Sequence, residues 1–203
     1  MRLDLRSACL ALALPALASH LAAQDPRLAA RLAPGTGAVV QHLIDSAAGA
    51  GLPTEPLIKK ALEGESKGAD SARIVAAVQG LLTHLSTARQ LFGPAALEAE
   101  LVAGAAALRA GATPSSLARL SALRPREQLT VPLSVLADLL ASGIPVQQAW
   151  SSVYDMASQG ATDAAFLALR DRLTGPDSRR SPGMPPPAEH PPTAPLPGTE
   201  RSP

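Results

Sequence analysis

Residues 64–68 read Gly-Glu-Ser-Lys-Gly and match the G-x-S-x-G pattern around the nucleophilic serine of many hydrolases. That chemistry needs a strand before the serine and a helix after it, because the serine must be held on a sharp turn. The residues before Ser66 have the pattern of a helix body. A second stretch, residues 156–160, keeps the serine and the last glycine but lacks the first. We therefore interpret both stretches as helix ends and keep a serine hydrolase only as a remote alternative.

The histidines show no spacing typical of a metal site. His42 and Asp45 are three residues apart on one predicted helix, so their side chains could touch. Both project away from the apolar residues Val39, Leu43 and Ala47, which indicates a solvated surface pair. The other histidines beyond residue 23 are isolated, one beside an apolar stripe and one near the C-terminus: His84 and His190. There is no His-Glu-x-x-His motif, so the sequence predicts no metal ligands.

Carboxylates and lysines alternate between residues 55 and 67. Glu55 precedes Lys59, and Glu63 precedes Lys67, by the four residues that favour an ion pair on a helix surface. General acid–base catalysis would need a cleft and shifted pKa values, which this pattern does not indicate. We interpret the segment, which also holds Lys60 and Glu65, as a solvated helix face.

The aromatic residues Trp150 and Tyr154 are one helical turn apart, and Phe166 follows in the next predicted helix. Such residues can anchor a partner or an apolar ligand. We expect them to belong to the core instead, because Phe166 corresponds to an apolar position of an earlier helix. The sequence thus predicts a non-enzyme without catalytic, cofactor-binding or metal-ligating residues and without a cofactor.

The first segment, residues 1–23, has the order of features of a secretory signal peptide. Two arginines precede an apolar run at residues 8–17, which is shorter than the roughly 20 residues of a membrane span. Small residues follow, and cleavage is expected after Ala23 or Ala18. The alternatives are a buried N-terminal helix and an uncleaved anchor. The only cysteine, Cys9, precedes most of the apolar run, which argues against a lipid anchor, and cleavage would leave a chain without thiols.

Ten of the 20 prolines lie in residues 176–203. Each proline removes a backbone donor and fixes φ, so we expect a disordered tail of polyproline II character. It could serve as a ligand for a proline-recognising partner or as a spacer, but a tolerated disordered end is the simpler interpretation. Residues 24–35 are expected to form a linker.

Between residues 36 and 175 the apolar residues recur at helical spacing. The segment after residue 70 is typical, with one stripe formed by Ile74, Val78, Leu81, Leu82 and Leu85. No stretch alternates like a strand between hairpin turns. These residues therefore predict an all-α domain of short helices.

The predicted helices are joined by one recurrent motif, a glycine followed by an apolar residue and then by Pro, Asp or Thr. The glycine suits the left-handed position that ends a helix, and Asp or Thr can cap the next helix. The apolar residue has an apolar partner five residues later, which is the spacing of a hydrophobic staple. The motif occurs five times, at Gly51-Leu52-Pro53, Gly68-Ala69-Asp70, Gly111-Ala112-Thr113, Gly143-Ile144-Pro145 and Gly160-Ala161-Thr162.

The motif also reveals an internal duplication. Residues 38–81 align without a gap to residues 130–173, and the identical positions include the junction glycines. Each copy predicts three short helices, and a helical pair at 94–110 and 114–123 lies between them. We expect an internally duplicated helical-repeat array or bundle.

The composition of the chain argues against some classes of partner. The net charge of +1 and the scarcity of aromatics argue against a nucleic-acid partner. No membrane span is expected after the leader. The sequence predicts an exported, periplasmic or extracellular protein that acts as a protein-interaction or scaffolding module of the cell envelope. The partner would be another envelope or extracellular protein. The alternative is a small helical carrier of an apolar ligand.

Overall fold

The structure is a computed structural model and describes residues 25–125 and 127–175. Within these residues it is all-α, with no strand, which confirms the all-α part of the predicted fold. The expected leader and the expected proline-rich tail lie outside the described residues. The nine helices of the described residues are α1 Pro26–Arg31, α2 Pro34–Gly49, α3 Glu55–Ser66, α4 Ser71–Phe92, α5 Glu98–Arg109, α6 Pro114–Leu123, α7 Thr130–Ala141, α8 Val146–Ser158 and α9 Asp163–Thr174.

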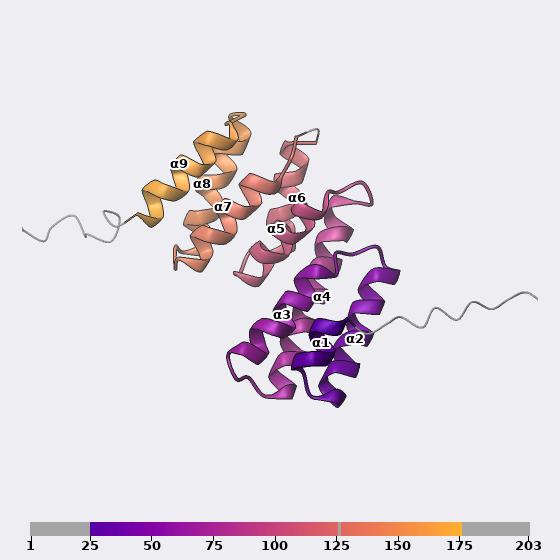
Figure 1. Cartoon of the computed structure of the whole chain (residues 1–203). Coiled ribbons are helices and arrows are strands. Elements are labelled where there is room, and N and C mark those ends of the chain that lie inside the picture. Colours follow the sequence, from indigo (N-terminus) through magenta and orange to yellow (C-terminus); the bar gives the residue numbers. More distant parts are fainter. Residues whose placement is uncertain (1–24, 126, 176–203) are drawn as a thin grey trace, which may run out of the picture.

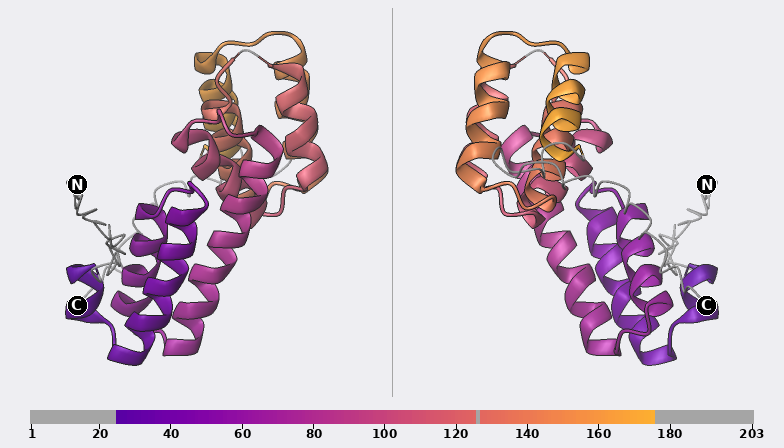
Figure 2. Two further views of the ribbon diagram at one scale, coloured as in Figure 1. Left: turned by 90° about the vertical axis from the view of Figure 1, so that its right-hand side faces the viewer. Right: turned by 90° about the vertical axis from the view of Figure 1, so that its left-hand side faces the viewer.

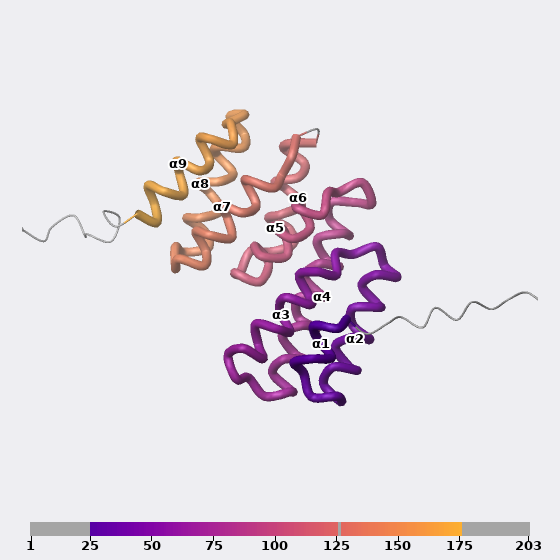
Figure 3. Tube along the Cα trace, in the orientation of Figure 1, coloured from indigo at the N-terminus to yellow at the C-terminus, as the bar shows by residue number. Residues whose placement is uncertain are grey.

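The helices form two groups that follow each other along the molecule (Figure 1). We call α1–α4 the N-terminal half and α5–α9 the C-terminal half. The long helix α4 packs on α2 and α3 in the first half and on α5 and α6 in the second, so it joins the two (Figure 2). The chain trace passes through the helices in sequence order from one end of the molecule to the other (Figure 3). Among the described helices, none is both long and apolar enough to cross a membrane.

Each half has its own apolar core. Fully buried leucines and valines from α1 to α4 fill the first, and α6, α7, α8 and α9 fill most of the second. In the first core, Ile74, Val78 and Leu85 of α4 are buried as the apolar stripe predicts, while Leu81 and Leu82 are half-buried. The largest fully buried side chain is Phe166 of α9, in the second core.

Helix α5 contributes to both cores. Leu101 and Ala105 belong to the N-terminal core, whereas Ala103, Ala107 and Leu108 belong to the C-terminal core. Small side chains on several faces allow α5 to lie close to α4 on one side and to α7 on the other.

One glycine makes the contact between α4 and α5 especially close. A Cβ atom at Gly104 would lie 2.6 Å from a ring carbon of Phe92 and 3.3 Å from the Cβ of Ala88. Any larger residue at this position would have to displace one of these side chains.

The five predicted junctions end their helices in the same way. Each junction glycine has a positive φ, from 65° at Gly51 to 111° at Gly111. At Gly68, for example, the glycine N–H donates to the carbonyl of Glu65, and the next N–H, of Ala69, donates to the carbonyl of Gly64. The same two bonds recur at the other four junctions, which satisfies carbonyls that would otherwise lack donors at each helix end.

The predicted caps and staples are also present. Asp70, Thr113 and Thr162 each accept a hydrogen bond from the backbone N–H three residues later. The five staple partners are all buried, and each lies in the same core as its junction residue: Leu57, Ile74, Leu117, Ala149 and Phe166.

The segment expected to be a linker contains helix α1. Leu28 is fully buried in the N-terminal core, and Leu32 joins it there. Asp25 caps the helix by accepting from the Arg27 N–H, and the Arg27 guanidinium binds both carboxylate oxygens of Glu55 at 3.0 and 2.8 Å. Residues 26–31 are therefore part of the folded domain rather than a linker, because Leu28 and Leu32 find apolar partners on neighbouring helices.

Helix α2 differs from the expectation in its orientation. Its buried residues include Val40, Ile44 and Ala47, whereas Val39 is 47% exposed. Apolar residues occur around most of this helix, so periodicity alone did not distinguish the face with Val39 from the face with Val40.

Candidate docking surface

The G-x-S-x-G pattern lies at a helix end, as expected. Ser66 is the last residue of α3, and its hydroxyl donates to the carbonyl of Glu63. Ser158, the last residue of α8, does the same toward the carbonyl of Asp155. A Cβ at Gly64 would lie 2.9 Å from Cγ1 of Ile74, so the first glycine of the pattern serves the packing of α3 on α4. Helix α3 occupies the place where the nucleophile turn would need a strand.

His42 and Asp45, which the sequence placed close together on one helix, form no hydrogen bond with each other. Asp45 accepts from the Gln41 amide at 2.8 Å, and His42 is exposed. His84 is half-buried on α4, and His190 lies outside the described residues. Among residues 25–125 and 127–175, no group of three or more His, Cys, Asp or Glu side chains is placed to hold a metal ion.

The predicted charged face of α3 is present as a set of ion pairs. Glu63 accepts from Lys67 at 2.5 Å and from Lys60 at 2.9 Å. Hydrogen bonds from these two lysines, Lys67 first, lower the pKa of the Glu63 carboxyl to about 2. Glu55 pairs with Lys59 at 3.9 Å in addition to Arg27. These groups are well solvated, so the pairs contribute little to stability.

The aromatic residues divide between the core and the surface. Phe166 is fully buried, as expected, and the Arg124 guanidinium lies 5.5 Å from its ring centre. Trp150 and Tyr154 are only half-buried on α8, with their ring centres 5.2 Å apart. The guanidinium of Arg119, from α6, lies 5.6 Å from the ring centre of Tyr154. The expectation that the aromatics belong to the core is confirmed for Phe166 and in part for Trp150, which packs against the same core, whereas Tyr154 lies outside it.

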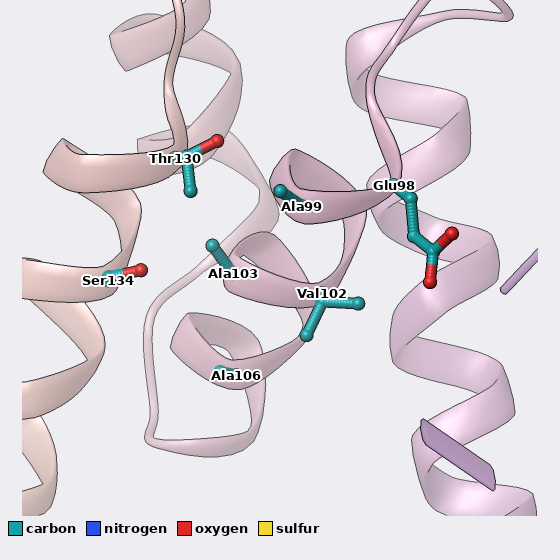
Figure 4. A pocket seen from close by; sticks show the side chains of 7 residues that line it. All are labelled: Glu98, Ala99, Val102, Ala103, Ala106, Thr130 and Ser134. Carbon is teal, nitrogen blue, oxygen red and sulfur yellow. The ribbon is translucent and has the colours of Figure 1, made fainter. Parts of the chain in front are cut away.

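A hollow of about 560 Å³ opens along the outer face of α5. Figure 4 shows its alanine and valine side chains on the central helix, with Thr130 and Ser134 of α7 on one side and Glu98 at the other. We call this surface the α5 groove and define it by its floor: Ala99, Val102, Ala103 and Ala106.

A second hollow, of about 260 Å³, adjoins the first. It shares Val102 and Ala106 with the α5 groove and extends toward Pro56 on α3 and Leu81 on α4. Its charged residues are Lys60, Glu63 and Arg109. The groove is thus the apolar middle of a larger hollowed face, with charges of both signs at its edge. Val102 stands between the hollows and is 36% exposed.

Two charged residues are buried in the C-terminal half, and one of them joins the helices that form the groove. Glu100 is only 9% exposed; its carboxylate accepts from the Leu97 N–H at 3.0 Å and from the Leu129 N–H at 2.9 Å. It therefore ties the start of α5 to the start of α7, the two helices that form the groove. Arg124 is 6% exposed; it donates to the carbonyl of Ala161 at 3.0 Å and pairs with Glu127.

No pattern in the sequence points directly to the groove. Its floor consists of alanines and one valine, which are as common in a core as on a surface. A faint signal was the Glu at position 100 within the first turn of a predicted helix, three residues after Leu97, as in a capping box. Comparison of the chain with protein-family models, with curated proteins and with solved structures found no match.

Proposed function

We propose that the protein is an exported, non-enzymatic interaction module of the cell envelope that holds a partner protein in the α5 groove. The observation that carries the proposal is the hollowed apolar face on α5, where Val102 remains 36% exposed between two adjoining hollows. Exposed apolar surface with a polar rim is typical of a protein-binding site.

The shape of the groove favours a helix of the partner as the bound element. Ala99, Ala103 and Ala106 follow each other along α5 at the spacing of one helix face, and their methyl groups let another backbone come close. Val102 would contribute apolar area, and Thr130 and Ser134 offer hydroxyl groups at the edge. An amphipathic helix with small apolar residues fits this combination.

The rim of the hollowed face would favour a partner with charges of both signs. Lys60 and Glu63 lie on one side, Arg109 near the end of α5, and Glu98 at its start. Charges at a rim steer the encounter and select the orientation more than they add affinity. A partner whose charges alternate along one edge of its helix is therefore expected.

The place of action rests on the leader. Residues 1–23 have the pattern of a cleaved export signal, and we propose that the mature protein acts in the periplasm or outside the cell. Cleavage would remove Cys9, so the exported chain would need no oxidative folding step.

We also propose that the domain arose by duplication of a three-helix unit. At the offset of 92 residues, α3 corresponds to α8, and Ser66 and Ser158 make the same bond to the carbonyl three residues earlier. The copies have diverged in packing, since α3 packs on α4, whereas α8 and α9 both pack on α7. The two related copies, with α5 and α6 between them, would form the hollowed face at their junction.

The proposal can be tested with a photoreactive amino acid placed in the full chain inside the producing cell. At Val102 it should crosslink one partner reproducibly, whereas at Leu167, which is 39% exposed on α9, it should not. A Val102→Arg substitution should abolish crosslinking from the neighbouring position Ala99, and Leu167→Arg should leave it unchanged. Equal crosslinking from positions 102 and 167, or none from 102, would contradict the proposal.

The geometry favours docking over the alternative functions. The hollows on α5 are open to solvent, whereas a carrier of an apolar ligand needs an enclosed cavity. The hydroxyl of Ser66 donates to a carbonyl of its own helix and forms no hydrogen bond with a histidine of the described residues. A Ser66→Ala variant that lost activity toward ester probes would revive the hydrolase alternative.

A further inference from the structure

Helix α8 carries an apolar ridge on its outer side. Val146, Trp150 and Tyr154 are four residues apart, so they follow one another along the same side of the helix over about 12 Å. Val146 is 46% exposed, and the two aromatic rings are half-buried, although the neighbouring stripe of α8 is buried in the core. We call these three residues the α8 ridge.

The residues of the α8 ridge are of the types that bind ligands or partners at protein surfaces. It combines two amphipathic aromatic rings with a cation, because the Arg119 guanidinium lies over the Tyr154 ring at 5.6 Å. Trp, Tyr and Arg are the residues that most often carry the energy of an interface. The chain has one Trp and one Tyr, and both are on this ridge.

Two adjacent aromatic side chains, with their ring planes tilted by 47°, and a nearby donor favour a proline-rich ligand. Proline rings pack against Trp and Tyr, and a polyproline II segment leaves its carbonyls unbonded, so an arginine can donate to them. Four residues of such a segment span about 12 Å, which matches the length of the α8 ridge. The α5 groove has no aromatic side chain among its lining residues and does not offer this chemistry.

The chain itself contains a ligand of this kind. Residues 185–187 are three consecutive prolines, and Pro191 and Pro192 follow shortly after. Pro182 is seven residues beyond Gly175, the last described residue of this end, and seven residues in polyproline II form reach about 22 Å.

The C-terminal end of α9 and the start of the ridge, at Val146, lie at the same end of α7. Helices α8 and α9 both pack on α7, and the short connections make α8 run antiparallel and α9 parallel to it, so the first residue of α8 and the last of α9 are at that end. The contact between Arg170 and Asp138, at 3.7 Å, fixes the last turns of α9 and α7 at this end. Trp150 and Leu173 both pack partly against the same core.

We propose that the proline-rich segment 182–197 docks on the α8 ridge of its own molecule. The prolines cover Trp150 and Tyr154, and Arg119 donates to the carbonyls of the segment. The C-terminal segment is thereby a ligand carried by the protein itself, at a site separate from the α5 groove. A proline-rich segment of another protein would compete for the same residues.

The single tryptophan makes this proposal measurable in the full-length chain. Acrylamide quenching of Trp150 fluorescence should increase about twofold when Pro185, Pro186 and Pro187 are all replaced by Ser, because one face of the ring loses its cover. A control with Thr193→Ser and Thr199→Ser keeps every proline and should quench like the wild type. Far-UV circular dichroism should be unchanged in both variants, since neither alters a described residue.

Two further measurements decide the proposal. A synthetic peptide of residues 181–197, added to the triple-Ser variant, should restore the protection of Trp150, and the same peptide with its prolines replaced by Ser should not. Protection in the wild type should not depend on protein concentration. Equal quenching in wild type and triple-Ser variant would overturn the proposal, and so would protection that disappears on dilution, which would indicate docking between two copies.

Discussion

Replacement of Glu100 tests the idea that one buried carboxylate holds the α5 groove together. Its two oxygens accept from the N–H groups of Leu97 and Leu129, and the side chain is only 9% exposed. A hydrogen bond to a charged group contributes about 1.5–3 kcal/mol, so the loss of two should lower the free energy of unfolding by about 3 kcal/mol in Glu100→Ala. That is a large part of the 5–15 kcal/mol typical of a domain.

Two further variants, Glu100→Gln and Glu98→Ala, serve as comparisons for Glu100→Ala. Glu100→Gln keeps one acceptor but turns an amide donor toward the other N–H, so a loss of about 1.5 kcal/mol is expected. Glu98→Ala removes an exposed carboxylate from the same helical turn and should cost less than about 1 kcal/mol.

Urea unfolding followed by circular dichroism at 222 nm measures these values. Trp150 fluorescence provides a second probe, specific to the C-terminal half. Because Glu100 joins the start of α5 to that of α7, Glu100→Ala should also weaken crosslinking from the α5 groove. A Glu100→Ala variant no less stable than Glu98→Ala would refute the reasoning.

Three further predictions concern single substitutions measured by the same unfolding assay. Gly68→Ala should lower the free energy of unfolding by about 1 kcal/mol, because the φ of Gly68 is 67°. Gly80→Ala, inside α4 with open space around it, should raise it by about 0.5–1 kcal/mol. Changes of the same sign in both variants would contradict the helix-end role of Gly68. Arg124→Ala should cost about 2 kcal/mol because the Ala161 carbonyl loses its donor and a buried side chain is removed, and the exposed control Arg172→Ala should cost less than about 0.5 kcal/mol. Glu63→Gln should lower stability at pH 7 by a few tenths of a kcal/mol, because the folded-state pKa is depressed. This difference should shrink as the pH falls below about 4.5 and through about 2, and a difference as large at pH 2 as at pH 7 would exclude the ion pairs as its cause.

The parts of the fold that depend on neighbouring residues were predictable. The positive φ at Gly68, the cap at Asp70 and the staple partner Ile74 all follow from a few consecutive side chains and backbone groups. Such local signals act over one helical turn, so a single sequence contains all that is needed to recognise them.

The parts that depend on distant residues were not predictable. Leu28 is buried only because α1 finds a place on α2 and α3, and nothing in residues 24–35 alone indicates that. Helix α5 is rich in alanine, so its pattern did not show which positions would face each core and which would line a groove. The bond between Glu100 and Leu129 joins residues 29 apart and depends on how α5 and α7 meet.

The exposure of Trp150 and Tyr154 also could not be predicted from the sequence. Trp150 and Tyr154 have the spacing of core residues, and the neighbouring positions Ala149 and Val153 are fully buried. One helical face can contain both a buried stripe and an exposed ridge when the helix lies at the edge of a bundle. Only the position of α8 in the structure separates the two.

The shared use of helix α5 also sets the order in which the protein can fold during synthesis. The chain emerges from its N-terminus, so α1–α4 can gather before Leu101 and Ala105 arrive, but their core stays open on one side until then. The 12 residues of α5 close the first core and begin the second. In the interval before α5 emerges, the open side of α4 is the surface that a chaperone would be expected to bind.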